Sequence, residues 1–293
     1  MIALAIISIP LGSMGAPGSE TRTLVAPDGI TRSYRLYRGA GIQPGTPAPL
    51  LVLMHGLIGS ATQAERSYKW NELADRLGYV VAYPEGIGNS WNAGDCCGAA
   101  GQRGVDDVGF LASLLDEVTA TEGVDPDRIF AAGISNGAMM SYRLACDLPG
   151  RLAAIASVAG TMVTPCESPS PISVLEIHGT GDSLVPYEGA ERNSMRPIPG
   201  VMQFWRDVGG CSAPESNVVG PVTVERSSCD AGRSVTLIRI ERGTHVWPVA
   251  SRFPLQRLLA ALGLRTPDRS VDGSTEMSKF FQQQPRVGAG LAG

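Results

Sequence analysis

The chain has 293 residues, of which 43% are hydrophobic and 18% charged, and its formal net charge is −4 at pH 7. This length and composition are typical of a globular protein of one or two domains that buries a large core. The slightly acidic balance argues against a nucleic-acid partner, which would require a basic surface. The body of the chain contains no apolar run long enough to span a membrane.

The first residues have the pattern of a secretory signal. Residues 1–11 are almost wholly apolar, and small residues beginning with Gly12 and Ser13 follow them, as in the hydrophobic region and cleavage site of an export signal. No positively charged residue precedes the apolar run, so a misassigned or truncated start is expected. An N-terminal strand or helix packed on the body is the alternative to a signal. We predict a signal segment over residues 1–16.

Eight stretches of the chain have the character of β-strands. Residues 21–25 and 31–37 alternate around the turn Pro27-Asp28-Gly29 and predict an antiparallel hairpin. Residues 50–54 form a continuous apolar run, which is typical of a strand covered on both faces. The other predicted strands are 79–83, 129–132, 153–158, 172–177 and 235–240, and the predicted helices are 65–77, 108–121, 138–148, 201–207 and 274–284.

Strands that alternate with helices predict an α/β fold with a mostly parallel, doubly wound sheet. We expect about eight strands with helices on both faces. No repeat or break in composition divides the body, so we predict one domain over residues 20–285 and a disordered tail over 286–293. The long loop over residues 85–104 is predicted to be functional, because loops of this length are uncommon inside compact domains. Ligands of such sheets bind beyond the carboxyl ends of the strands.

Six cysteines fit an exported protein with disulfide bonds. Cys211 and Cys229 bracket a loop rich in Pro, Ser and Asn and are the first predicted pair, and Cys146 and Cys166 are the second. The adjacent Cys96-Cys97 are left open between a vicinal bridge and other partners, because six cysteines allow 15 connectivities. The chain has no Cys-x-x-Cys pair and no Cys/His cluster. We therefore expect no metal site and no cofactor.

The stretch Gly133-Ile134-Ser135-Asn136-Gly137 lies between an apolar run and a helical run. This is the strand–Gly-x-Ser-x-Gly–helix context of a nucleophile elbow. The turn is so sharp that a side chain two positions before or after the serine would collide with the strand or the helix. The helix that starts there directs free N–H groups toward the serine. An ordinary Gly-rich turn between a strand and a helix is the alternative.

Ser135, Asp182 and His245 follow predicted strands in the order Ser…Asp…His that α/β-hydrolases use. A serine hydroxyl needs an adjacent base, and the base needs an orienting acid. Of the three histidines, only His245 follows the last predicted strand. We predict Ser135 as nucleophile, His245 as general base and then acid, and Asp182 as the holder of the imidazole tautomer. Asp182 as a turn cap is the alternative, and His178 is predicted to brace the Asp182 loop.

Two N–H donors must bind the oxyanion of such a mechanism. We predict the backbone N–H of Asn136, which follows the nucleophile, and that of Leu57, in the loop after strand 50–54. His55, Trp91 and Trp247 are the candidate substrate-binding residues, because an aromatic ring beside the cleft can stack on an acyl group or line an apolar pocket. Core packing of the two tryptophans and a structural role for His55 are the alternatives.

Six motifs follow one another through the body of the chain. They are Leu53-Met54-His55-Gly56, Trp91-Asn92-Ala93-Gly94 with Cys96-Cys97-Gly98, Val105-Asp106-Asp107-Val108-Gly109-Phe110, Gly133-Ile134-Ser135-Asn136-Gly137, His178-Gly179-Thr180-Gly181-Asp182 and His245-Val246-Trp247-Pro248. Together they resemble the motifs of the secreted polyhydroxybutyrate depolymerase-like and feruloyl esterase-like esterases. The sequence departs from the family pattern at Thr244, where glycine usually precedes the histidine, and at Leu57, where many depolymerase relatives carry cysteine.

The resemblance implies an α/β-hydrolase fold, a triad of Ser135, Asp182 and His245, and a secreted bacterial protein. We predict a serine carboxylic-ester hydrolase that works through an acyl-enzyme on feruloyl or acetyl esters of plant polysaccharide, or on short polyhydroxyalkanoate esters. A serine peptidase on the same fold and a non-catalytic binding protein are the alternatives. The expected partner is thus a small-molecule or polysaccharide-linked ester. The sequence leaves the natural ester and the oligomeric state open.

Overall fold

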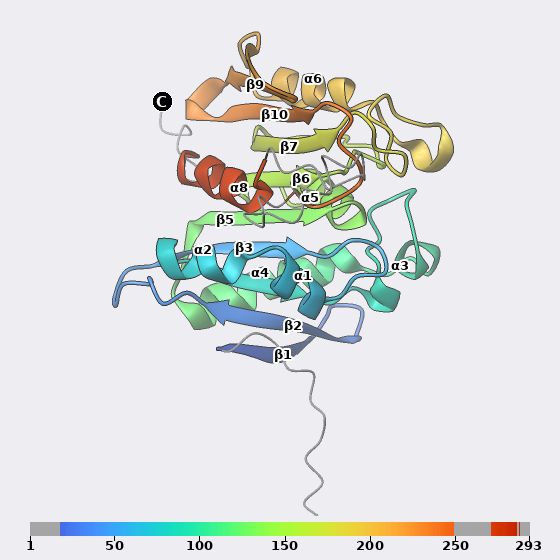
Figure 1. The fold of residues 1–293 in the computed structure, drawn as a ribbon. Coiled ribbons are helices and arrows are strands. Elements are labelled where there is room, and N and C mark those ends of the chain that lie inside the picture. Colours follow the sequence, from blue (N-terminus) through green and yellow to red (C-terminus); the bar gives the residue numbers. More distant parts are fainter. Residues whose placement is uncertain (1–17, 249–270, 286, 288–293) are drawn as a thin grey trace, which may run out of the picture.

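The computed structural model describes residues 18–248, 271–285 and 287. The predicted signal over residues 1–16 and the predicted tail, apart from residue 287, lie outside the described residues. Ten strands in the described part form one sheet in the order β1-β2-β4-β3-β5-β6-β7-β10-β9-β8 (Figure 1). Their bounds are β1 Ser19–Val25, β2 Thr31–Arg38, β3 Ala48–Met54, β4 Val80–Pro84, β5 Val124–Ile134, β6 Ala154–Val158, β7 Ser173–Gly179, β8 Glu215–Val219, β9 Val222–Ser228 and β10 Ser234–Ile240.

The centre of the sheet is parallel, and both edges are antiparallel. Parallel pairs join β4, β3, β5, β6, β7 and β10 in that spatial order. At one edge β1 and β2 form the predicted hairpin, whose turn contains Gly29 at a φ of 80°. At the other edge β9 pairs with β10 and β8 pairs with β9, both antiparallel. The predicted α/β class with a mostly parallel sheet is confirmed.

The sheet has two strands more than the eight that the sequence pattern predicts. The additional strands, β8 and β9, form a hairpin in the segment between Cys211 and Cys229, where the pattern indicates a loop. All five residues of β8 are exposed. A strand at the edge of a sheet with solvent on both faces has no apolar alternation, so its sequence carries no signal of period two.

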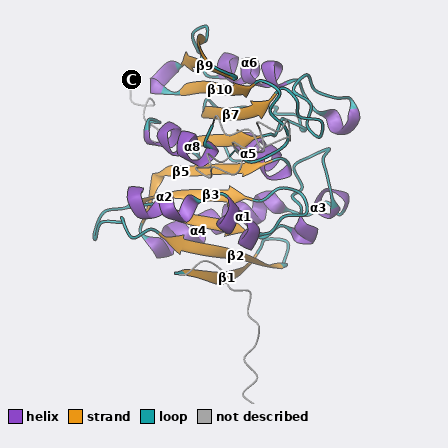
Figure 2. Cartoon of the chain, viewed as in Figure 1, coloured by secondary structure: helices purple, strands orange, loops and turns teal. Residues whose placement is uncertain are grey.

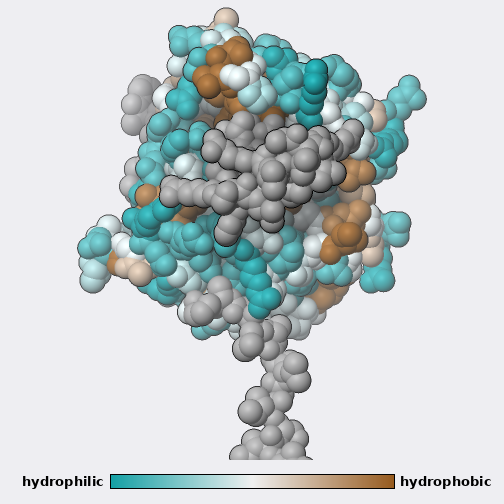
Figure 3. Space-filling view, in the orientation of Figure 1, coloured by the Kyte–Doolittle hydropathy of each residue, from teal (hydrophilic) through white to brown (hydrophobic). Residues whose placement is uncertain are grey.

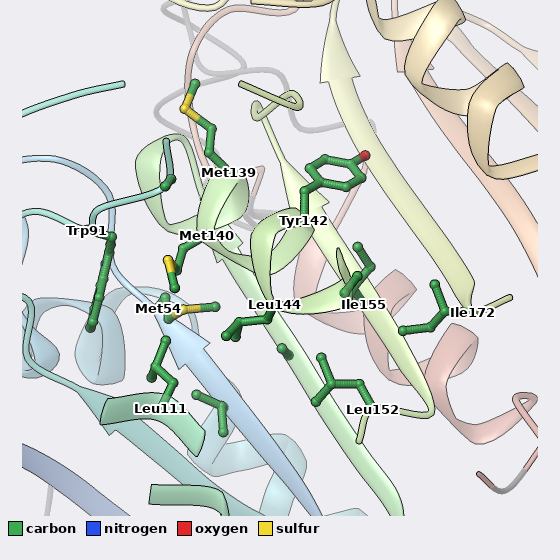
Figure 4. Close-up of a cluster of buried hydrophobic side chains, with 14 of the residues drawn as sticks. Met54, Trp91, Leu111, Met139, Met140, Tyr142, Leu144, Leu152, Ile155 and Ile172 are labelled. Atoms are coloured by element: carbon green, nitrogen blue, oxygen red, sulfur yellow. The ribbon is translucent and has the colours of Figure 1, made fainter. Parts of the chain in front are cut away.

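Helices cover both faces of the sheet, as the sequence predicts (Figure 2). The alternation of β3 shows why its sequence is apolar throughout: Leu50 and Val52 pack in one core and Leu51 and Leu53 in the other. Figure 4 shows part of the first core, between α5 and the sheet. The helices of this core are α4 Asp107–Glu122, α5 Asn136–Asp147 and α6 Ile198–Val208, and those of the second are α1 Ala61–Ser67, α2 Trp70–Leu77 and α8 Gly273–Gln282.

The parallel strands bring their carboxyl ends to one side of the molecule, the right side of Figure 1. There β3 ends at Met54, β5 at Ile134, β7 at Gly179 and β10 at Ile240. Each of the predicted catalytic residues follows one of these strands, so the topology places all three at this edge. The loop over residues 85–104, with the short helix α3 (Ala99–Gln102), lies on the same side.

Three disulfide bonds join the six cysteines. Cys211–Cys229 and Cys146–Cys166 are the two pairs predicted from the sequence. Cys96–Cys97 forms the vicinal bridge that was one of the open alternatives. The Cys146–Cys166 bond ties the end of α5 to the segment after β6, so it stabilises the helix that begins beside Ser135.

The face of the molecule seen in Figure 3 is mostly hydrophilic, with separate hydrophobic patches. Two of the exposed large apolar side chains, Leu57 and Ile58, follow β3 at the edge where the predicted site lies. Within the described residues, no helix is both long and apolar enough to cross a membrane.

Candidate active site

Ser135 occupies the sharp turn between β5 and α5. Its backbone has a φ of 55° and a ψ of −123°, a conformation that residues with a side chain rarely adopt. A Cβ atom at Gly133 would lie 2.5 Å from the carbonyl carbon of Gly137, and one at Gly137 would lie 2.4 Å from the carbonyl oxygen of His55. Both separations are too short for non-bonded atoms, so the fold requires glycine at both positions. The Gly-x-Ser-x-Gly stretch thus forms a nucleophile elbow.

Asp182 and His245 form a close hydrogen-bonded pair. The Nδ1 atom of His245 lies 2.8 Å from Oδ2 of Asp182. The other carboxylate oxygen, Oδ1, accepts the backbone N–H groups of Leu184 and Val185, each at 2.9 Å. Burial alone would raise the pKa of Asp182, but the hydrogen bonds from His245 and Val185 hold that pKa below its ordinary value. An ionised Asp182 keeps the proton of His245 on Nδ1 and leaves Nε2 free to accept one.

Ser135 and His245 line the same cleft. The cleft has a volume of about 320 Å³ and opens at the carboxyl edge of the sheet. None of its lining residues that the structure describes is Asp, Glu, Lys or Arg, so the cleft is suited to uncharged groups. The cleft is lined by Gly56, Leu57, Ile58, Gly59, Gln63, Tyr68, Ile134, Ser135 and His245.

The two predicted oxyanion donors come from different elements: Leu57 from the loop after β3, and Asn136 from the start of α5. Asn136 is the first residue of α5, and the first N–H groups of a helix have no acceptor within the helix. Leu57 lines the cleft in the loop after β3. The next N–H groups in that loop hold its shape, since Ile58 donates to the carbonyl oxygen of Asn89 at 2.8 Å and Gly59 to that of Gly56 at 3.0 Å. The assignment of Leu57 and Asn136 to an oxyanion hole stays a prediction.

The side chain of Trp91 is wholly buried, as in the core-packing alternative, and its contact with the substrate stays a prediction. Trp91 connects the Asn136 side chain to the backbone of His55. Its backbone N–H donates to Oδ1 of Asn136 at 2.6 Å, and its carbonyl oxygen accepts from Nδ2 of Asn136 at 2.9 Å. Its indole Nε1–H donates to the carbonyl oxygen of His55 at 2.9 Å. Trp91 and the Asn136 side chain therefore clamp the loop after β3 against the start of α5.

His55 is also wholly buried, as its structural alternative expects, and its contact with the substrate stays a prediction. The backbone N–H of Gly86 donates to its Nε2 atom at 3.0 Å, and its Nδ1 atom lies 2.8 Å from the carbonyl oxygen of Gly56. These partners require an unprotonated Nε2 and a proton on Nδ1, the neutral imidazole. Burial lowers the pKa of His55 in agreement with this state. His55 thus fastens the loop after β3 to the segment after β4.

Comparison with known proteins identifies the family. A family model described as "Esterase PHB depolymerase" matches residues 32–200, more than half of the chain. The chain belongs to this esterase family. It is therefore a carboxylic ester hydrolase of the polyhydroxybutyrate depolymerase and feruloyl esterase type, as the motifs imply.

Individual relatives agree with the family. The protein named "Putative esterase NocK" from Nocardia uniformis subsp. tsuyamanensis is 32% identical over 291 residues, which cover 88% of this chain and 83% of the relative. Feruloyl esterase B from Piromyces equi is 30% identical over 241 residues, and the match covers 74% of this chain but only 44% of that protein. The solved acetyl xylan esterase from Aspergillus awamori has a TM-score of 0.59 at 16% identity over 83% of this chain and 99% of that one. That likeness shows a shared α/β-hydrolase fold.

Among the described residues, the lining of the cleft does not include Trp247, which lies behind Tyr68. Its side chain is buried, and its ring stacks on that of Tyr68 with centroids 4.0 Å apart and an interplanar angle of 13°. Its Nε1–H donates to Oγ of Ser274 in α8 at 3.1 Å. Tyr68 lines the cleft, so Trp247 supports a cleft residue, and its direct contact with the substrate stays a prediction.

A buried ion pair anchors the loop that carries Trp91. Arg32 donates to Oδ1 of Asp107 at 2.7 Å, and both side chains are almost inaccessible to solvent. The other oxygen of Asp107 accepts the backbone N–H of Asn92 at 2.7 Å. Burial raises the pKa of Asp107, although the hydrogen bonds from Asn92 and Arg32 oppose this. Asp106 rather than Asp107 caps α4, because its Oδ1 accepts the N–H of Gly109 at 2.9 Å.

We expect Arg32→Met to destabilise the esterase by about 3–5 kcal/mol, because it leaves the buried carboxylate of Asp107 without its counter-charge. Guanidinium chloride unfolding measures this loss. The matched control is the double variant Arg32→Met/Asp107→Asn, whose neutral amide oxygen still accepts the N–H of Asn92. The double variant should be the more stable of the two, and equal stabilities would contradict an unpaired charge as the cause.

Several residues that shape this site do not stand out in the sequence. Glu176 has a recognisable signal, since a carboxylate between the apolar residues Leu175 and Ile177 of a buried strand needs a buried partner. Gln63 and Tyr68 line the cleft from α1 and its end, but nothing in their local pattern separates them from other helix residues.

Proposed function

We propose that this esterase hydrolyses feruloyl or acetyl esters of plant polysaccharide, or short polyhydroxyalkanoate esters, through an acyl-enzyme on Ser135. One observation carries the proposal: His245, hydrogen-bonded to Asp182, lines the same uncharged cleft as Ser135 at the nucleophile elbow.

In this mechanism the free Nε2 of His245 takes the proton of the Ser135 hydroxyl as its oxygen attacks the ester carbonyl carbon. The carbonyl oxygen becomes an oxyanion, which the N–H groups of Leu57 and Asn136 stabilise. His245 then gives the proton to the leaving alcohol, and the acyl group stays on Ser135. A water molecule repeats the sequence, with His245 as base, and releases the carboxylic acid.

The lining of the cleft supports an uncharged, partly apolar substrate. Leu57, Ile58 and Ile134 supply apolar surface, and Gln63 adds a polar amide. Such a mixture suits an ester whose acyl group is apolar and whose hydroxyl groups need a hydrogen-bond partner. The name of the Piromyces equi relative supports the feruloyl class. The three disulfide bonds suggest an oxidising, extracellular location.

A hydrolysis panel tests the proposal with methyl ferulate, acetylated xylan and hydroxybutyrate oligomers as substrates. We expect turnover of at least one of them, and complete loss of that turnover when a fluorophosphonate reacts with Ser135, located by peptide mass spectrometry. A Ser135→Ala variant should not be labelled. Release of 4-nitroaniline from peptide anilides without hydrolysis of any ester would contradict the proposal and favour a peptidase.

A further inference from the structure

A chain of buried polar side chains lies behind Asp182, and the proposed mechanism does not use it. Tyr142 of α5 donates its hydroxyl to Oε2 of Glu176 at 2.8 Å. The other oxygen of Glu176, Oε1, lies 2.8 Å from Nδ1 of His178, two residues further along β7. All three side chains are inaccessible to solvent. Burying a polar group is costly unless it is hydrogen-bonded, and each of these three side chains has a partner.

The partners of His178 restrict its protonation state. Its Nδ1 faces the Glu176 carboxylate, and its Nε2 lies 2.9 Å from the carbonyl oxygen of Val185. The carbonyl oxygen of Val185 can only accept, so Nε2 of His178 carries a proton. A second proton lies between Nδ1 and Oε1 of Glu176: on Nδ1 it makes an imidazolium–carboxylate pair, and on Oε1 it makes a neutral pair. Burial raises the pKa of Glu176, and the hydrogen bond from His178 opposes this. Burial alone would lower the pKa of His178, but Glu176 holds it above the ordinary value.

His178 acts on Asp182 in two ways. Its Nε2 lies 3.6 Å from Oδ2 of Asp182, the same oxygen that accepts from His245. It also binds the carbonyl oxygen of Val185, whose N–H donates to Oδ1 of Asp182. The ring thus fixes the turn that aims the carboxylate and, as an imidazolium, places a positive charge beside it.

We propose that His178 is a positioning residue for ester hydrolysis: held as an imidazolium by Glu176, it aims Asp182 at His245 and opposes proton uptake by that pair. The inference rests on the proposed function, because it assigns an effect on Asp182 and His245. Other titratable or charged groups also face His178. The Tyr187 ring lies 6.0 Å away between centroids, and Arg239 is its register neighbour on β10.

Nitrogen NMR of the unmodified protein labelled with ¹⁵N-histidine tests the protonation state directly. The chain has three histidines, so the ring signals are few enough to assign. We expect both ring nitrogens of His178 to stay protonated from about pH 6 to 8, beyond the range in which a free histidine loses its proton. His55 serves as an internal reference with one unprotonated nitrogen. An unprotonated ring nitrogen on His178 at neutral pH would overturn the inference.

The double variant Glu176→Gln/His178→Gln tests the effect on catalysis. It removes both charges, while the amide of residue 178 can still donate to the carbonyl oxygen of Val185. We expect the acid limb of the kcat/KM profile, which reports proton uptake by the Asp182–His245 pair, to move to higher pH by about half a unit to one unit. At the plateau we expect a lower kcat, because the flexible amide of residue 178 holds the Val185 turn less firmly than the His178 ring does.

Tyr142→Phe is the matched control, because it removes a hydrogen bond to Glu176 and leaves both charges in place. Its acid limb should not move. A folded double variant with an unshifted limb contradicts the inference, as does a fall in kcat that is equal at all pH values. If the unmodified protein shows no hydrolysis that depends on Ser135, the proposed function fails, and the NMR measurement still decides the state of His178.

Discussion

Asp182→Asn is expected to lower kcat by about 10⁴-fold, because it reverses the tautomer of His245. The turn after Asp182 determines which way the new amide faces. Oδ1 accepts the N–H groups of Leu184 and Val185, so the carbonyl oxygen of Asn must take that position. The NH₂ group then faces Nδ1 of His245, which can bind it only as an acceptor. The proton of His245 moves to Nε2, where it blocks proton transfer from Ser135.

The kinetics of p-nitrophenyl acetate hydrolysis measure this effect. Ser135→Ala should lower kcat by about 10⁶-fold, and adding Asp182→Asn to it should lower kcat little further, because residues that act as a unit are not additive. Thermal unfolding of Asp182→Asn controls for loss of structure. A decrease of less than tenfold in a folded Asp182→Asn variant would contradict the role of Asp182 in holding the tautomer.

The sequence predicts the parts of this fold whose pattern is local. The run 50–54 is apolar at every position because Leu50 and Leu51 enter different cores, and the same reasoning locates the other central strands. The two glycines around Ser135 identify the elbow, because a residue with a side chain does not fit in place of Gly133 or Gly137. Strand ends then place Ser135, Asp182 and His245 at one edge without any knowledge of the coordinates.

What the sequence does not predict depends on contacts between distant residues. Trp91 stands in a polar loop, where its pattern favours an exposed ring, yet it is buried through contacts with Asn136 and His55, 45 and 36 residues away. The hydrophobic periodicity of a segment says which face is buried, but it does not identify the partner on the other side. An exposed edge strand such as β8 is also not predicted, because it buries neither face and so has no hydrophobic pattern.

Asn136→Ala is expected to impair both stability and catalysis, because the Asn136 side chain holds Trp91, whose indole binds the start of the Leu57 loop at His55. The change leaves the N–H of Trp91 without the acceptor it has at 2.6 Å, while the carbonyl oxygen of Trp91 keeps the N–H of Ala93 at 3.0 Å. One buried backbone group without a partner costs about 1–3 kcal/mol in unfolding free energy. The loop of His55 and Leu57 also loses its tie to α5, so the oxyanion donors no longer stay in place. We expect kcat to fall by about 10²–10³-fold, as when one oxyanion donor is lost, with little change in KM.

Two further variants separate this clamp from a general loss of packing. Ser141→Ala is the matched control, since Ser141 is equally buried in α5 and its hydroxyl donates only within the helix, to the carbonyl oxygen of Gly137 at 3.2 Å. It should leave kcat within about threefold of the unmodified enzyme. Asn136→Asp preserves the shape of the side chain but sets a carboxylate oxygen against the carbonyl oxygen of Trp91, so it should lose at least as much activity as Asn136→Ala. An Asn136→Asp variant with unmodified kcat would show that the oxyanion donors are held without the amide donor of Asn136, even with a carboxylate in its place.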